Sequence, residues 1–114
     1  MGLSQETKEG VLILHLEGNL IGEEIGSRVL DAANDAINQG IHLCAVDISE
    51  VKYINSSGIG VLITLLTKFR NKEGEIIVVN PSEHVNKLLM ITKLTAIFKI
   101  ADSVDAAVKQ LISR

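Results

Sequence analysis

The segment "AVDISEVKYINSSGIGVLITL", Ala45 to Leu65, passes from an apolar run through two adjacent serines into a second apolar run. Together with the two residues before it, the first run reads "LCAVDI" and is apolar on both faces, which is typical of a central strand covered on both sides. From Ile59 to Lys72 the apolar residues recur at helical spacing, with Leu62 and Phe69 on one stripe. The sequence therefore predicts a buried strand, a loop that contains both serines, and a helix.

The same alternation of strand and helix patterns continues on both sides of this segment. Before it, the sequence predicts a weak strand at "LSQET", a strand at "VLILHLE" with Leu12, Leu14 and Leu16 on its buried face, and a helix over residues 22–39. After it come a strand at "EIIVVN" and a helix that buries Val85, Leu88 and Leu89. The chain ends with a short strand near residues 96–100 and a last helix with Val104, Ala107, Val108 and Leu111 on its inner face. This order predicts an α/β fold with a mixed, mostly parallel sheet of about four to five strands and four helices. We expect one domain over residues 1–114, because the chain is too short for two independent cores.

Capping residues predict where the last two helices begin. In "NPSE" we expect Asn80 to be the N-cap, Pro81 to take the first helical position and Glu83 to complete a capping box. Asp102 is expected to cap the last helix.

Composition argues against several classes of function. The net charge is −3 and no lysine or arginine cluster is present, so we expect no nucleic-acid partner. No apolar run approaches the roughly 20 residues that span a bilayer, and the first ten residues do not resemble a secretion signal, so we expect no membrane insertion and a cytoplasmic protein. Cys44 is the only cysteine, and His15, His42 and His84 are scattered, so we expect no metal and no cofactor.

The two serines allow two interpretations, which do not exclude each other. The Ser57 hydroxyl could cap the free amides of the helix that follows. The same helix start would also tolerate a phosphate on Ser57, and the neighbouring Gly58 and Gly60 leave room for another protein to approach.

This segment does not match the catalytic and phosphate-binding motifs that contain serine or glycine. A nucleophile elbow needs a glycine two residues before the serine, where Ser56 has Ile54. None of the histidines is placed by the sequence as a catalytic base, and "GIG" is too short for a phosphate-binding loop. We therefore expect that the protein is not an enzyme.

The opening segment resembles the signature of the STAS domain, the family of bacterial anti-sigma-factor antagonists. In that family a strand ending in Asp leads through an Asp-Ser-Ser-Gly or similar turn into an apolar helix, and here Asp47, Ile54, both serines, Gly58 and Gly60 occur in that order. The resemblance covers the whole chain, including a Gly18-Asn19-Leu20 turn before the first helix, the region "VVNPSEHVNKLLMITKLTAIFKI" and the final "SVDAAVKQL" helix.

The resemblance implies a regulated protein–protein interaction. In phosphorylatable members, the serine directly before the glycine is phosphorylated by a serine kinase that is also the anti-sigma factor. That serine is Ser57 here, with Ser56 as second choice. The unphosphorylated form binds the kinase and frees the sigma factor, and a phosphatase reverses the modification. The partner-binding residues implied are Gly18, Asn19, Asp47, Ile54, Asn55, Ser56, Ser57, Gly58 and Ile59.

One position departs from the family pattern, and one other class of function stays open. Many phosphorylatable members have aspartate two residues before the acceptor, where this chain has the neutral Asn55. STAS-like domains also serve as accessory or sensor modules of transporters, lipid-trafficking machinery and signalling complexes, in which the serine can be a cap alone. A histidine-kinase-like ATPase as partner would favour the antagonist, and a membrane transporter would favour the accessory module.

Overall fold

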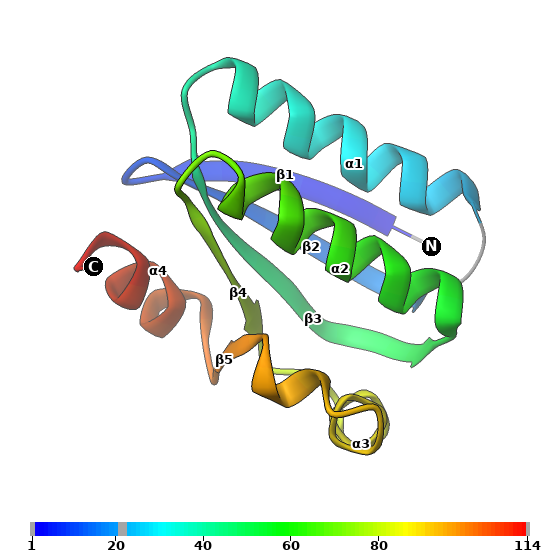
Figure 1. The fold of residues 1–114 in the computed structure, drawn as a ribbon. Coiled ribbons are helices and arrows are strands. Elements are labelled where there is room, and N and C mark those ends of the chain that lie inside the picture. Colours follow the sequence, from blue (N-terminus) through cyan, green and yellow to red (C-terminus); the bar gives the residue numbers. More distant parts are fainter. Residues whose placement is uncertain (1, 21–22, 114) are drawn as a thin grey trace.

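A computed structural model describes residues 2–20 and 23–113 of the protein (Figure 1). Its elements are β1 (Gly2–Lys8), β2 (Val11–Leu20), α1 (Glu23–Asn38), β3 (Leu43–Ile54), α2 (Ser56–Arg70), β4 (Glu75–Val79), α3 (Glu83–Ile91), a 3-10 turn (Leu94–Ala96), β5 (Lys99–Ala101) and α4 (Val104–Ile112). In the described residues the strands form one five-stranded sheet in the order β1-β2-β3-β4-β5. β1 is antiparallel to β2 and the other neighbours are parallel, which confirms the predicted mixed α/β sheet with four helices.

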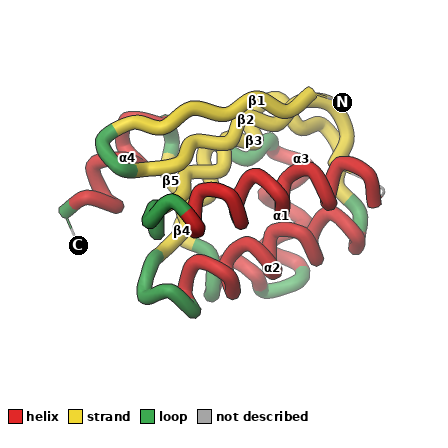
Figure 2. Tube along the Cα trace, turned by 90° about the horizontal axis from the view of Figure 1, so that it is seen from above, coloured by secondary structure: helices red, strands yellow, loops and turns green. Residues whose placement is uncertain are grey.

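Helices cover both faces of the sheet. α1 and α2 lie side by side on one face, and α3 packs at the edge of the same core through Val85 and Leu89 (Figures 1 and 2). α4 covers the other face, where Ala107, Val108 and Leu111 pack in a second cluster. The predicted inner residues of all four helices are therefore buried, except Leu88 and Val104, which are partly buried.

The central strand β3 is longer and more irregular than the sequence predicted. Its register with β2 shifts twice: His15 pairs with Asp47 and Glu17 with Glu50, and then Gly18 pairs with Val51 and Asn19 with Tyr53. At each shift β3 contains one residue more than β2, which is the mark of a β-bulge. The residues of β3 in the larger core change their spacing from two to three at the same places: Cys44, Val46, Ile48, Val51 and Ile54. The bulges therefore keep apolar side chains facing the helices to the end of the strand.

Three predicted boundaries are wrong by a few residues. The N-caps of α3 and α4 are Ser82 and Ser103, whose hydroxyls accept from the amides of Val85 and Ala106, instead of Asn80 and Asp102. Asn80 has a φ of 48°, a left-handed conformation that does not belong to an N-cap. The short strand expected near residues 96–100 is β5, and residues 94–96 form the 3-10 turn instead.

Within residues 2–20 and 23–113, each helix is too short or too polar to cross a bilayer.

Candidate functional site

The start of α2 is set by Asn55. This residue has extended backbone angles, φ −114° and ψ −172°, and its side-chain oxygen accepts a hydrogen bond of 3.0 Å from the Gly58 amide. Its carbonyl accepts from the Ile59 amide at 2.9 Å, which closes the first turn. The predicted cap at Ser57 is therefore wrong, because α2 begins three residues earlier than expected and both serines lie inside its first turn.

Both serines face outward. Asn55, Ser56 and Ser57 are exposed, whereas Ile54 and Gly58 are buried on either side of them. Among the described residues, the Ser57 hydroxyl makes no hydrogen bond, so it is free for an external group. No acidic residue lies in the first turn of α2. A negative group on Ser57 would meet the positive end of the helix and no neighbouring carboxylate in that turn.

A line of small and apolar residues continues from the serines along the outer face of α2. At helical spacing from Ser56 come the partly exposed Gly60, then Ile63, which is 37% exposed, and then Thr67. A Cβ atom added to Gly60 would meet no heavy atom within 4 Å. Packing inside the protein therefore gives no reason for a glycine here, although glycine in a helix interior costs about 1 kcal/mol relative to alanine.

The end of β2 lies beside this helix start. Asn19 pairs with Tyr53 and Leu20 with Ile54, so the final residues of β2 adjoin the final residues of β3. Gly18 and Asn19, predicted as a turn, are strand residues instead, and Gly18 has a φ of 91° that a side chain would strain. The structure thus brings Gly18, Asn19 and the Asn55–Gly58 segment to one end of the sheet.

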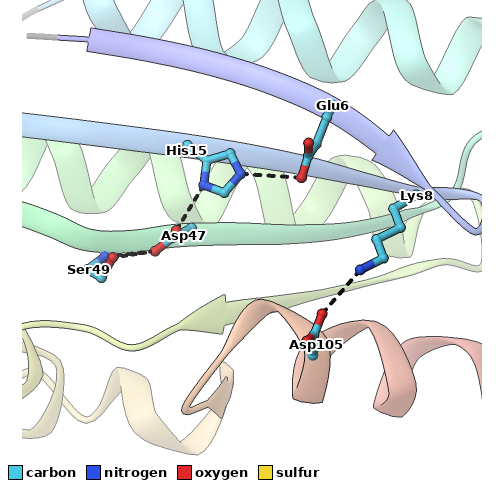
Figure 3. Close-up of polar contacts among 6 residues, drawn as sticks. All are labelled: Glu6, Lys8, His15, Asp47, Ser49 and Asp105. Atoms are coloured by element: carbon cyan, nitrogen blue, oxygen red, sulfur yellow. Dashed lines mark hydrogen bonds and ion pairs between the residues drawn. The ribbon is translucent and has the colours of Figure 1, made fainter.

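Asp47 lies apart from the other predicted site residues. Its side chain is on the α4 side of the sheet, where Oδ1 accepts from the Ser49 amide at 3.0 Å and from the Ser49 hydroxyl at 2.7 Å (Figure 3). Oδ2 lies 2.9 Å from Nδ1 of His15, whose Nε2 lies 3.6 Å from Glu6 on β1. Burial would raise the pKa of Asp47, but the hydrogen bonds from Ser49 and the contact with His15 outweigh it and hold the pKa below its ordinary value.

The sequence did not predict the His15–Asp47 contact. His15 is four residues after Val11 and Asp47 is four residues after Leu43, and Val11 pairs with Leu43 in the parallel register. An assumed alignment of the two strand starts would have placed the two side chains next to each other, but nothing in one sequence fixes that alignment.

A second missed feature is a shallow groove of about 530 Å³ between the end of β3 and the start of α3. Tyr53 lies there with its ring edge against His84, at a centroid distance of 5.4 Å. Both residues come from segments that were predicted, but their contact depends on how α3 returns to the sheet.

Among the described residues, no group of three or more His, Cys, Asp or Glu side chains is arranged to hold a metal ion. Cys44 is buried in the core, where burial raises the pKa of its thiol. The predicted structural role of this cysteine is therefore consistent with its position.

Comparison with known proteins places these features in a family. A family model described as the STAS domain matches residues 3–107. A Thermotoga neapolitana protein assigned as an anti-sigma factor antagonist is 30% identical over 81 residues, which are 71% of this chain and 72% of that protein. BtrV of Bordetella bronchiseptica, also assigned as an anti-sigma factor antagonist, is 27% identical over 94% of this chain and 91% of its own length.

Solved structures agree on the fold. The crystal structure of a Thermotoga maritima protein assigned as an anti-sigma factor antagonist has a TM-score of 0.85, at 24% identity over 96% of this chain and 93% of that chain. The anti-sigma factor antagonist SpoIIAA, solved in its unphosphorylated form, has a TM-score of 0.76 at 17% identity, covering 98% of each chain. SpoIIAA has also been solved in a phosphorylated form, with a TM-score of 0.75 at 18% identity, over 96% of this chain and 98% of that chain.

Proposed function

The chain belongs to the STAS domain family, and we propose that it is an anti-sigma-factor antagonist switched off by phosphorylation of Ser57. The observation that carries the proposal is the exposed, unbonded Ser57 hydroxyl in the first turn of a helix whose cap is supplied by another residue. Relatives assigned to this function, and a fold shared with an antagonist solved in both phosphorylation states, support it.

In the unphosphorylated state, the protein binds an anti-sigma factor that is also a serine kinase, and so releases the sigma factor. The proposed contact surface consists of Ser56, Ser57, Gly60 and Ile63 on α2 together with Asn19 at the end of β2. This surface is neutral and contains no bulky side chain except Ile63, so a kinase can bring its own active site close to the hydroxyl.

Phosphorylation ends the interaction through charge. A phosphate adds roughly −1.5 to −2 charges and three acceptor oxygens at the centre of a surface that otherwise presents a neutral hydroxyl. The fold tolerates the group, because the amide end of α2 favours negative charge, while the bound partner would have to desolvate it. A coupling of about 3 kcal/mol between phosphorylation and binding would weaken the complex about 150-fold.

Asn55 is compatible with this role. At an N-cap, asparagine and aspartate act alike, because each offers an oxygen to the amide of the third helical residue. Asn55 makes this bond to Gly58. The replacement of aspartate by asparagine therefore keeps the acceptor turn intact and removes a charge that would lie close to the phosphate.

In this proposal the protein is a substrate of the kinase and of a phosphatase, and it carries out no catalysis of its own. The kinase supplies ATP and the phosphatase restores the Ser57 hydroxyl.

Capture experiments in the source bacterium test the function directly. Tagged wild-type chain is expected to retain a histidine-kinase-like ATPase, Ser57→Ala to retain it even after ATP is added, and Ser57→Asp to lose most of it. Ser56→Ala is the matched control: it removes a neighbouring hydroxyl but keeps the acceptor, so ATP should still release the ATPase from it. If the chain instead retains a membrane transporter, and no Ser57 variant changes this, the antagonist function is wrong and the accessory-module function is supported.

A further inference from the structure

At the first bulge of β3, a side chain accepts a hydrogen bond from a backbone amide of the same strand. Where β3 gains a residue relative to β2, between the pairs His15–Asp47 and Glu17–Glu50, the ladder of backbone hydrogen bonds is interrupted. The Ser49 amide lies in this interval and donates to Oδ1 of Asp47 at 3.0 Å. The Asp47 side chain thus gives this amide an acceptor at the point where the register shifts.

Two further contacts fix the orientation of the Asp47 carboxylate. The Ser49 hydroxyl donates to the same Oδ1 at 2.7 Å, and Nδ1 of His15 lies 2.9 Å from Oδ2 (Figure 3). Asp47 therefore binds the bulge on one side and strand β2 on the other. Its side chain is only 18% exposed, so these contacts are partly shielded from water.

The bulge decides which residues of β3 face the core and which reach the acceptor site. Side chains alternate along a regular strand, so without the extra residue Glu50 would take the inward position that follows Ile48. With it, Val51 is buried, and the second bulge, after Val51, then brings Ile54 inward and pairs Tyr53 and Ile54 with Asn19 and Leu20. The position of Asn55, one residue later, follows from this register.

We propose that Asp47, held by His15 and Ser49, is a positioning residue that fixes the phosphoacceptor turn relative to the end of β2. This role rests on the proposed function, because the turn is positioned for the kinase. It differs from the direct partner contact that the sequence predicted for Asp47, since its carboxylate is occupied by contacts within the chain.

Nuclear magnetic resonance tests the structural half of the proposal without any kinase. In ¹⁵N-labelled protein, Asp47→Ala is expected to shift the amide resonances of Ser49 and also those of Gly58 and Ile59 at the acceptor turn. Asp47→Asn keeps an acceptor oxygen for the Ser49 amide and should restore most of the wild-type positions. Asp105→Ala is the matched control: it removes a carboxylate that binds Lys8 at 3.2 Å on the same side of the sheet, and should leave Gly58 and Ile59 unshifted.

Phosphorylation kinetics test the functional half. With the captured kinase and saturating ATP, Asp47→Ala should be phosphorylated at least about tenfold more slowly than wild type, with Asp47→Asn close to wild type and Asp105→Ala unchanged. If Asp47→Ala does not fold, Ser49→Ala, which removes only the hydroxyl bond, takes its place and should slow the reaction to a smaller degree.

A folded Asp47→Ala, or Ser49→Ala in its place, with unshifted Gly58 and Ile59 amides and a wild-type rate overturns the positioning role. A wild-type chain that gains no phosphate on Ser57 overturns the proposed function instead, while the resonance shifts still decide whether Asp47 fixes the turn.

Discussion

Asn55 caps helix α2 and Ser57 is the proposed phosphoacceptor, whereas the sequence allowed Ser57 to do both. The cap oxygen comes from Asn55, at 3.0 Å from the Gly58 amide, and the Ser57 hydroxyl stays free. A residue that is needed to hold the helix start cannot also be modified without loss of that bond. Separation of the two roles means that phosphate can be added to Ser57 while the cap remains in place.

The difference is measurable by urea unfolding. Asn55→Ala should lower the free energy of unfolding by about 1 kcal/mol, because the Gly58 amide loses its acceptor, and Asn55→Asp should keep most of the stability. Ser57→Ala should change the free energy of unfolding by less than about 0.5 kcal/mol, as for a surface position without a bonded side chain. Equal losses for Asn55→Ala and Ser57→Ala would contradict the assignment of the cap.

Adjacent capping residues explain why sequence alone misplaced these helix starts. "NSSG" and "NPSE" each contain several residues that cap well, and side-chain chemistry does not tell which one adopts the extended backbone of an N-cap. In the third helix Asn80 takes a left-handed conformation and leaves the cap to Ser82. In the last helix Ser103, the residue after Asp102, is in the extended conformation and supplies the cap oxygen.

At the scale of single elements, helix α2 contains a glycine that packing within the protein does not require. Two glycines offer opposite environments: a Cβ on Gly60 of α2 meets open space, whereas a Cβ on Gly26 of α1 would lie 2.9 Å from a methyl group of Val61. Gly26 is explained by the close approach of the two helices. Gly60 has no such explanation within the chain, which is why we assign it to the partner surface.

Alanine substitutions separate these two cases. Gly60→Ala should raise the free energy of unfolding by up to about 1 kcal/mol, because alanine favours the helix, and should weaken binding of the captured kinase. Gly26→Ala gains the same helix preference but forces a 2.9 Å contact with Val61, so its free energy of unfolding should be lower than that of Gly60→Ala. Calorimetry and a binding titration on both variants give the answer, and a Gly60→Ala protein that binds as tightly as wild type would remove Gly60 from the surface.

Strand β3 was predicted in part. Its apolar first half was evident from "LCAVDI", and the change of spacing at Ile48, Val51 and Ile54 is visible in the sequence. That change indicates bulges only after the strand is known to continue, and the charged Glu50 and Lys52 do not mark this stretch as a strand. The contacts of Asp47 with Ser49 and His15 depend on those bulges, so they could not be derived without the register.

At the level of the whole molecule, two carboxylates couple stability to pH. Burial would raise the pKa of Glu75, but the Ile76 amide, Arg70 and Lys99 outweigh it and hold the pKa below its ordinary value, as Ser49 and His15 do for Asp47. A carboxylate with a lowered folded-state pKa stabilises the fold above its unfolded pKa and loses that contribution as the pH falls through the folded-state value.

The free energy of unfolding should therefore decrease as the pH falls below about 4. Urea titrations at a series of pH values provide the measurement. Asp47→Asn removes one of the two groups, so its curve should fall less steeply in the same range. A wild-type curve that stays level through this range would show that neither carboxylate is stabilised by the fold.

The overall fold was predictable because the spacing of apolar residues marks the buried faces of the strands and helices. The burial of β3 on both faces follows from "LCAVDI", which is apolar on both faces. That the two serines lie near the junction of a central strand and its helix was predictable for the same reason, although the sequence placed them in a loop and the structure places them in the first turn of α2. The residues around the proposed acceptor could not be predicted from the sequence. Asn19 lies there because it pairs with Tyr53 on the neighbouring strand, more than thirty positions away in the sequence.

Mass spectrometric mapping of the phosphate is the most direct test of this account. The wild-type chain is incubated with the captured kinase and ATP, digested and sequenced by fragmentation, with Ser57→Ala and Ser56→Ala treated in parallel. We expect a single phosphate on Ser57 in the wild-type and Ser56→Ala proteins, none in Ser57→Ala, and loss of the kinase from the modified chain. A phosphate on Ser56 alone, or an unmodified chain that still leaves the kinase when ATP is added, would contradict it.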